Sequence, residues 1–166
     1  VAYLDQTGDL PRCDVTALNG LCNDCVESVL PELHSGVSLL GELTPDDPVV
    51  RTNLKRIEQV LLRLLRNAAK FTLSGHITLT YDCLPAERLL RFSVTDTGPG
   101  IPADLREEVF GRFVKLDPFS QGTGLGLPIC RLIAAKLGGR LFVDPEYASG
   151  CRMIFDVPFD LPETSA

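Results

Sequence analysis

Apolar residues recur with helical spacing in two long segments of the chain. The first segment predicts an amphipathic helix that is capped by Asp14 or Thr16 and runs to about Leu33, with an apolar face made of Val15, Leu18, Leu21, Cys22, Cys25, Val26, Val29 and Leu30. The second predicts a helix from about Asn53 to Thr72, with a buried stripe of Leu54, Ile57, Leu61, Leu64, Leu65 and Ala68. Both faces need a second layer to cover them.

Shorter runs with alternating or continuous hydrophobicity predict the strands of that layer. They span Val37 to Leu43, His76 to Cys83, Leu89 to Thr95, Arg140 to Asp144 and Cys151 to Phe159. A Pro-rich turn follows the first run, and Pro-Ala-Glu joins the second and third into a hairpin.

Two further helices are predicted, from Pro102 to Phe113 and from Leu125 to Leu137, the latter ended by Gly138-Gly139. Helices and antiparallel hairpins together predict an α+β fold, a two-layer α/β sandwich with helices packed on one face of a mixed, largely antiparallel sheet. We expect one domain over residues 13–160, with 1–12 as a linker remnant and 161–166 as a C-terminal tail.

Composition limits the classes of function. A chain of 166 residues with 45% hydrophobic residues suits a single core. The formal net charge of −6 argues against nucleic-acid binding by bulk electrostatics, so any bound phosphate must be held locally. No apolar run approaches the ~20 residues that span a bilayer, so we expect no membrane contact by this domain.

The cysteines lie among apolar neighbours, which favours buried free thiols in a reducing compartment over a disulfide framework. Cys22 and Cys25 form a CxxC pair without a second pair or a suitably placed histidine. Two packing or surface residues on a helix are therefore the favoured interpretation over metal or redox use.

The most informative motif is Asp96-Thr97-Gly98-Pro99-Gly100-Ile101-Pro102. A carboxylate at the end of a strand, followed by two glycines, places a hydrogen-bond acceptor beside backbone that a flat ligand can approach closely. Such a carboxylate accepts from the exocyclic amine of adenine and repels the oxygen of guanine, which predicts ATP over GTP. Taken alone, the motif also fits a Gly-Pro turn capped by its aspartate.

The segment Gly122-Thr123-Gly124-Leu125-Gly126-Leu127 opens a predicted helix. Its alternate glycines leave backbone N–H groups unshielded at a helix N-terminus, where negative charge is favoured, so the segment predicts phosphate binding. It lacks the Gly-Lys-Ser/Thr ending of a P-loop, and a flexible glycine hinge is the alternative.

Arg63, Asn67 and Lys70 share a side of the second predicted helix that is distinct from its apolar stripe. Asn67 could complete the shell of a hydrated Mg²⁺, and Lys70 could meet a phosphate. An ordinary polar helix face is the alternative. Further along, Phe110 and Phe113 are spaced to pack on one face at the root of a movable loop, or simply in the core.

In their order and separation, these four segments closely resemble the N, G1, F and G2 boxes of histidine kinases. These kinases belong to the ATPase superfamily that they share with gyrase B, heat-shock chaperones and MutL. The resemblance covers roughly Val15 to Phe159 and implies the Bergerat-type ATP-binding fold, with ATP between the Asn67 helix and a lid at about Lys115 to Gly122.

The resemblance also implies roles for individual residues. Asn67 would bind Mg²⁺ and, with Lys70, form the catalytic pair, while Asp96 would bind the adenine amine. The other implied nucleotide contacts are Phe71, Gly98, Gly100, Ile101, Lys115, Gln121 and the phosphate-wrapping Gly122, Thr123, Gly124, Leu125 and Gly126.

The chain departs from the family pattern at three places. Arg63 stands where relatives that hydrolyse ATP carry a glutamate and many histidine kinases an asparagine. A cation cannot activate water as a general base, whereas a neutral imidazole acceptor does not need that base. The lid is short and contains Pro118 and Phe119, and Cys151 to Met153 is bulkier than the small polar residues usual there.

Neither His34 nor His76 matches the phosphoacceptor pattern, a histidine followed by an acidic residue on a helical hairpin. The resemblance therefore implies the catalytic domain of a bacterial sensor kinase whose hairpin domain lies elsewhere in the parent protein, with a response regulator as downstream partner. The apolar first helix and the Phe110/Phe113 region are candidate docking surfaces for the hairpin. We expect a cytoplasmic domain of a parent anchored in the inner membrane.

Three functions remain open at this point. An active domain would transfer the γ-phosphate of Mg-ATP to histidine. A nucleotide-binding module without chemistry would signal by lid closure, a possibility suggested by Arg63. An ATPase or a serine-directed relative of anti-sigma-factor kinases would turn over without a histidine acceptor.

Overall fold

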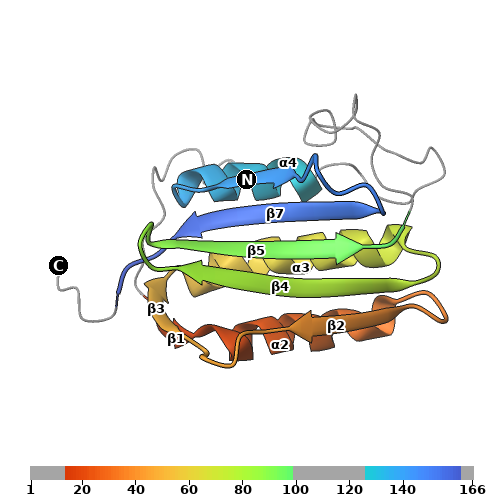
Figure 1. The fold of residues 1–166 in the computed structure, drawn as a ribbon, viewed down its shortest axis with the longest axis horizontal. Coiled ribbons are helices and arrows are strands. Elements are labelled where there is room, and N and C mark those ends of the chain that lie inside the picture. The colour runs from red at the N-terminus through yellow and green to blue at the C-terminus, as the bar shows by residue number, and fades with distance from the viewer. Residues whose placement is uncertain (1–13, 99–125, 162–166) are drawn as a thin grey trace.

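The computed structural model describes residues 14–98 and 126–161, which form two layers (Figure 1). In chain order, the elements are β1 (Asp14–Ala17), α2 (Leu18–Val29), the 3₁₀ turn η1 (Leu30–Glu32), β2 (Ser38–Glu42), β3 (Val49–Thr52), α3 (Leu54–Phe71), β4 (His76–Leu84), β5 (Leu89–Asp96), α4 (Gly126–Lys136), β6 (Arg140–Val143) and β7 (Cys151–Pro158).

A five-stranded sheet with strand order β2-β4-β5-β7-β6 forms one layer. The β2–β4 pair is parallel and the other pairs are antiparallel. The second layer lies on one face of this sheet, where α2 contacts β2, α3 contacts β4 and β5, and α4 contacts β6 and β7. The predicted α+β sandwich is confirmed, as are all five predicted strands to within one residue at each end.

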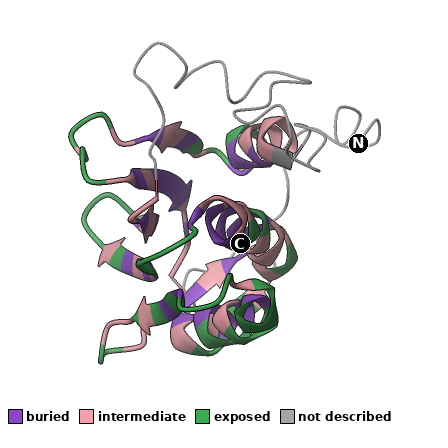
Figure 2. Ribbon diagram, turned by 90° about the vertical axis from the view of Figure 1, so that its right-hand side faces the viewer, coloured by how far each residue is buried: buried purple, intermediate pink, exposed green. Residues whose placement is uncertain are grey.

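The core lies between the two layers, as the buried positions in Figure 2 show. Strand β5 alternates strictly, so that Leu90, Phe92 and Val94 are buried between half-buried neighbours. Phe92 lies opposite Tyr81 on one side and Phe155 on the other, with ring centroids 5.8 Å apart in both pairs. Buried rings of this size hold three strands together on the helix-facing side.

Helix α3 forms as its apolar spacing predicts, with Ile57, Val60, Leu61, Leu64, Leu65, Ala68 and Ala69 buried. Two side chains cap its N-terminus. The Asn53 side chain accepts from the N–H of Arg56 at 3.1 Å, and Asp14 of β1 accepts from the N–H of Leu54 at 2.9 Å. These caps fix where α3 begins, and therefore the positions of Asn67, about one turn before its end, and of Lys70, its second-last residue.

The first predicted helix is wrong at its start, and its last residues, Leu30–Glu32, form a 3₁₀ turn instead of an α-helix. Residues 14–17 form a strand paired antiparallel with β3, and Val15 is 52% exposed instead of belonging to an apolar helix face. Helix α2 ends at Val29 because Pro31 has no N–H to continue the helical bonding, and Leu30 is 44% exposed.

Strand β3 was not predicted. It is short and contains the charged Arg51, so its hydrophobic pattern does not identify it as a strand. It forms because neighbouring segments pair with it. It pairs with β1, and Arg51 also exchanges backbone hydrogen bonds with Asp160 at 2.7 and 3.0 Å.

The cysteines of the described segments form no disulfide. Cys22 and Cys25 are 0% and 1% exposed in α2, and burial, the largest cause, raises the pKa of each thiol to about 12. They therefore pack as protonated core residues, which agrees with the favoured interpretation of the CxxC pair.

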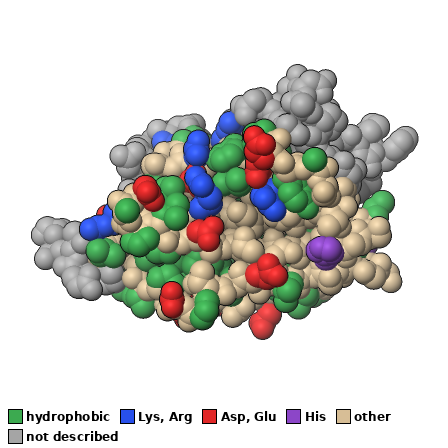
Figure 3. All heavy atoms as spheres, in the orientation of Figure 1, with side chains coloured by type: hydrophobic (Ala, Val, Ile, Leu, Met, Phe, Trp, Pro, Cys, Tyr) green, Lys and Arg blue, Asp and Glu red, His purple; other side chains and the backbone are tan. Residues whose placement is uncertain are grey.

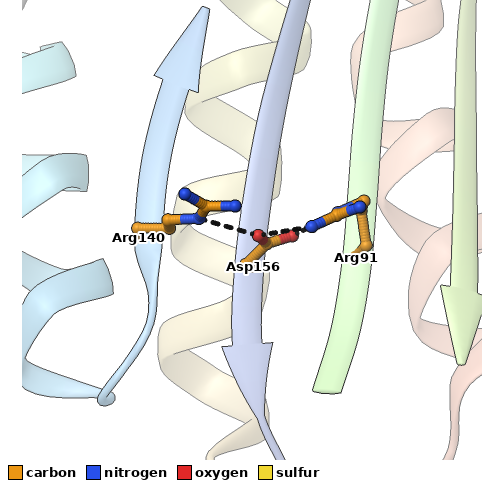
Figure 4. Close-up of polar contacts among 3 residues, drawn as sticks. All are labelled: Arg91, Arg140 and Asp156. Carbon is orange, nitrogen blue, oxygen red and sulfur yellow. Dashed lines mark hydrogen bonds and ion pairs between the residues drawn. The ribbon is translucent and has the colours of Figure 1, made fainter. Parts of the chain in front are cut away.

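None of the described helices covers the other face of the sheet, and Figure 3 shows it to carry mixed charged and apolar side chains. On this face, Asp156 of β7 lies between Arg91 of β5 and Arg140 of β6 (Figure 4). Arg91 donates to both carboxylate oxygens at 2.8 and 3.1 Å, and Arg140 donates at 3.0 Å. These bonds link three neighbouring strands.

In the part of the chain that the structure describes, no helix combines the length and hydrophobicity needed to cross a membrane.

Candidate nucleotide site

Asp96 is the last residue of β5 and belongs to the helix-facing row of that strand. The three residues before it in the row are core residues, so the alternation that buries them also buries this carboxylate, which is 8% exposed. Asp96 lies opposite Ile77 of β4 and Cys151 of β7. A charged acceptor is thus placed at the point where the core meets the end of the central strand.

The Asp96 carboxylate is held by backbone donors. Its Oδ1 accepts from the N–H of Gly98 at 2.9 Å, and the backbone of Cys151 also donates to the side chain. Burial raises the pKa of Asp96, and these two hydrogen bonds counteract the rise. The group is therefore a fixed, partly desolvated acceptor, the kind of group that recognises an amine at a specific position.

Close backbone packing fixes the end of β5, and glycines permit it. A Cβ on Gly150 would lie 2.0 Å from the carbonyl oxygen of Asp96, and one on Gly75 would lie 2.0 Å from Thr97 Oγ1. Thr97 Oγ1 also accepts from the N–H of His76 at 3.0 Å. The loops before β4 and β7 therefore pack against the segment that carries Asp96 and hold it in place.

The C-terminal end of α3 lies against this segment. A Cβ built on Gly98 would meet Asp96 Oδ1 at 3.1 Å, the carbonyl oxygen of Phe71 at 3.2 Å and Thr72 Oγ1 at 3.3 Å. The structure thus brings Phe71, Asp96 and Gly98 together, as the resemblance implied. Gly98 is confined by these three oxygens, which leave no room for a side chain without local movement.

Asn67 and Lys70 lie on the last two turns of α3 and are half-buried. The Lys70 ammonium lies 5.7 Å from the centroid of the Phe71 ring. On the other side of the helix end, His34 Nε2 lies 3.0 Å from the Lys70 carbonyl oxygen, and Arg66 pairs with Glu32 at 3.1 Å. The loop after η1 is therefore attached to the turn that carries Asn67 and Lys70.

Arg63 is exposed one turn before Asn67. It lies near Cys130 of α4, whose pKa burial raises to about 12 while the charge of Arg63 opposes the rise. Arg63 thus lies on the α4 side of α3, where it offers no carboxylate for activating water.

A hydrated Mg²⁺ fits the chemistry of this end of α3. Asn67 supplies an amide oxygen for which the described segments contain no hydrogen-bond partner, and Mg²⁺ takes few protein oxygens and keeps several waters. Among residues 14–98 and 126–161, no cluster of three or more His, Cys, Asp or Glu side chains forms an alternative metal site.

Several predicted site residues lie outside the described residues: Gly100, Ile101, Lys115, Gln121, Gly122, Thr123, Gly124 and Leu125. The same holds for the predicted helix from Pro102 to Phe113, for the Phe110/Phe113 pair and for the lid. Gly126 is described as the first residue of α4, so a helix begins at the end of the glycine-rich segment as predicted.

The sequence interpretation missed three residues that the structure brings to the site. Cys151 donates its backbone N–H to Asp96, and Gly150 packs against the same backbone. Thr72 lies beside Gly98 with a fully buried side chain. The sequence contained one signal for Thr72, a polar residue directly after an amphipathic helix, but no signal for its burial.

Residues 52–161 match the family described as histidine kinase-, DNA gyrase B-, and HSP90-like ATPase. Among curated relatives, the adaptive-response sensory kinase SasA of Parasynechococcus marenigrum is 39% identical over 76% of this chain and 34% of its own length. The sensor histidine kinase AruS of Pseudomonas aeruginosa is 33% identical over 99% of this chain and 17% of its own length.

Solved structures agree with these relatives. Full-length ShkA in complex with AMPPNP matches with a TM-score of 0.86 and 31% identity, over 99% of this chain and 34% of that one. The catalytic domain of the histidine kinase ThkA matches with a TM-score of 0.72 and 30% identity, over 87% of this chain and 96% of that one.

The chain spans 34% of the length of this SasA and 17% of that of AruS, but nearly all of the ThkA catalytic domain. Sequence and fold therefore agree with each other. The chain belongs to the histidine kinase-, DNA gyrase B- and HSP90-like ATPase family, and its relatives are sensor histidine kinases.

Proposed function

We propose that this chain binds Mg-ATP and transfers the γ-phosphate to a histidine on a separate helical-hairpin domain of its parent protein. The observation that carries the proposal is the buried Asp96 carboxylate, held by the N–H groups of Gly98 and Cys151 beside the end of α3. Such an acceptor suits the exocyclic amine of adenine and repels the oxygen of guanine at the same place.

The remaining roles follow from the positions on α3. Asn67 would hold the Mg²⁺, which when bound neutralises phosphate charge, and Lys70 would contact the phosphates as a point charge. The glycine-rich segment before α4 would bind the phosphates through backbone N–H groups. Transfer would then depend on positioning and charge, with the imidazole of the hairpin domain as the nucleophile. A response regulator would accept the phosphate afterwards.

A second candidate is a nucleotide-binding module without transfer, and Arg63 favours it. Its guanidinium is exposed one turn before Asn67, where a residue of the opposite charge would activate the attacking group. Phosphotransfer to histidine does not require that base, so Arg63 argues against ATP hydrolysis more strongly than against a kinase.

The first test compares the wild-type chain with Asp96→Asn for binding of ATP and GTP by calorimetry. We expect ATP to bind wild type far more tightly than GTP and Asp96→Asn to lose at least tenfold in ATP affinity, about 1.4 kcal/mol. Asp24→Asn, an exposed carboxylate on α2, is the matched control. ATP binding that is unchanged in Asp96→Asn would contradict the proposed site.

A folding control accompanies this comparison. The pKa of Asp96 is raised by burial, so its charge opposes folding once the pH exceeds the pKa of the unfolded chain. Asp96→Asn should therefore melt no lower than wild type at neutral pH, and its loss of binding cannot then come from unfolding.

The second test measures transfer of labelled γ-phosphate from Mg-ATP to the parent's hairpin domain. Wild type should label that domain on histidine, and Asn67→Ala should not. If wild type binds ATP and transfers nothing, the kinase proposal fails and the nucleotide-binding module replaces it.

A further inference from the structure

The oxygen atoms next to Gly98 include one that the proposed function does not use. Thr72 Oγ1 is fully buried, the residue is 0% exposed, and no hydrogen-bond partner for this oxygen is present in the described segments. A buried hydroxyl without a partner is costly, whereas a valine of the same shape would not carry that cost. The position therefore holds a polar atom that stabilises neither α3 nor the core.

The surroundings of this hydroxyl point to a ligand. Thr72 Oγ1 and Asp96 Oδ1 lie within 3.3 and 3.1 Å of a single point beside the Gly98 α-carbon. Two polar groups this close to one point can contact neighbouring atoms of one heterocycle. The carboxylate can only accept, whereas the hydroxyl can also donate. Together they match a donor and an acceptor side by side on the edge of a base.

Adenine presents this pair on two edges. The exocyclic amine is flanked by the acceptor nitrogens N1 and N7, and the amine is the group that Asp96 is proposed to bind. We propose that Thr72 is a second base-binding residue, whose hydroxyl donates to the ring nitrogen beside that amine, directly or through one water molecule. This inference rests on the proposed function of the site and adds to it the residue that orients the base.

The local structure explains how the hydroxyl is held in place. The N–H of Thr72 donates to the Ala68 carbonyl oxygen at 2.9 Å, so the residue is fixed as the end of α3. Its side chain lies against the Asp96–Gly98 segment. Thr97 of that segment contacts the loop before β4, which contains Gly75.

The test uses two variants of the 166-residue chain and three nucleotides. Thr72→Val keeps the shape and removes the hydroxyl, and Thr72→Ser keeps the hydroxyl. Binding of ATP, 1-deaza-ATP and 7-deaza-ATP, which lack N1 or N7, is measured by calorimetry for each, together with thermal unfolding without nucleotide.

We expect Thr72→Val to weaken ATP binding roughly five- to thirty-fold, the usual effect of losing such a hydrogen bond, and Thr72→Ser to restore most of it. The penalty of Thr72→Val should disappear for one of the two deaza nucleotides and persist for the other. Without nucleotide, Thr72→Val should unfold at the same temperature as wild type or higher.

Two results would overturn the inference. In the first, Thr72→Val binds ATP as wild type does, which leaves the proposed function intact. In the second, Thr72→Val weakens all three nucleotides equally, which would mean that the hydroxyl acts on the structure of the loop. Failure of the proposed function itself is distinguishable, because wild type would then bind no ATP at all.

Discussion

At the scale of single residues, the site depends on positions where no side chain fits. Gly98 faces three oxygen atoms at 3.1 to 3.3 Å from the place of a Cβ, and one of them belongs to Asp96. A methyl group there has to displace oxygens that the proposed site uses. The main chain around it would be less affected, because Gly98 has no φ in the left-handed region.

Gly98→Ala is therefore expected to lower ATP affinity by tenfold or more, about 1.4 kcal/mol, while unfolding changes by less than about 1 kcal/mol. Gly20→Ala is the matched control, because a Cβ there meets nothing within 4 Å and the residue lies within α2. It should stabilise the chain by about 0.5–1 kcal/mol and leave binding unchanged. Calorimetry and urea unfolding check both, and a Gly98→Ala chain that binds like wild type would contradict the geometry.

The residues also show which parts of the site could be predicted. Asp96 and Gly98 were found because a carboxylate followed by spaced glycines at a strand end is a local pattern. Thr72 and Cys151 were not found, because their roles arise from contacts between segments far apart in the chain. Helix propensity and alternation give no information on such contacts.

At the scale of elements, α3 was predicted almost to the residue and the segment before it was not. Seven buried residues at spacings of three and four, together with Asn53 as N-cap, are local signals. In contrast, β1 and β3 are four residues each and pair with one another, with one further bridge from Arg51 to Asp160. Strands this short are specified by tertiary partners, so the pattern of residues 14–17 was mistaken for a helix start.

The strand β1 contributes to the start of α3. Asp14 Oδ2 accepts from the N–H of Leu54, while Asn53 caps the N–H of Arg56. Asp14→Ala should therefore lower the free energy of unfolding by about 1 kcal/mol, as loss of a cap commonly does. Urea unfolding with an unchanged m-value checks this, and Asp24→Ala, an exposed aspartate within α2, should stay within about 0.5 kcal/mol of wild type. Equal stability of the two variants would rule out Asp14 as a cap.

The bonds across β5, β7 and β6 predict a pH dependence. Burial opposes the charge of Asp156, but Arg91 and Arg140 outweigh it and hold the pKa of this carboxyl below its usual value of 3.8. Because the pKa of this carboxyl is lower in the folded than in the unfolded chain, its ionised form stabilises the fold. This stabilisation is present above about pH 4 and is lost as the pH falls through the pKa of the folded state. Stability of the wild-type chain should decline over this acidic range.

Asp156→Asn should remove the part of this acid-dependent loss of stability that comes from Asp156. It should also lower the free energy of unfolding near pH 7 by about 1–3 kcal/mol, since a buried charged acceptor is lost. Both arginines reach solvent, with side chains 36% and 64% exposed, which limits the cost of leaving them unpaired. Asp144→Asn is the control, because its 3.6 Å pair with Arg152 is weaker and should cost less than about 1 kcal/mol. Thermal melts from pH 3 to 7 measure both, and identical acid profiles of wild type and Asp156→Asn would exclude the mechanism.

At the scale of the whole molecule, Asp96 connects both layers. It ends the central strand β5, its carboxylate is bound from β7, and the end of α3 lies against the residue two positions on. A ligand that binds there contacts groups from the sheet and from the helical layer. Because it would bind the folded chain and not the unfolded one, it should raise the stability of the entire fold.

Mg-ATP at a hundred times its dissociation constant should add about 2.7 kcal/mol and raise the melting temperature by roughly 5–10 °C for a chain of this size. GTP at the same concentration should shift it much less, because the fixed acceptor repels the guanine oxygen. Chelating the metal with EDTA should reduce the shift produced by ATP, since Asn67 would then lose the ion through which it acts. Differential scanning calorimetry of wild type and Asp96→Asn measures these shifts of the melting temperature. Equal shifts for ATP and GTP, or an undiminished ATP shift in Asp96→Asn, would show that the nucleotide does not bind at the end of β5.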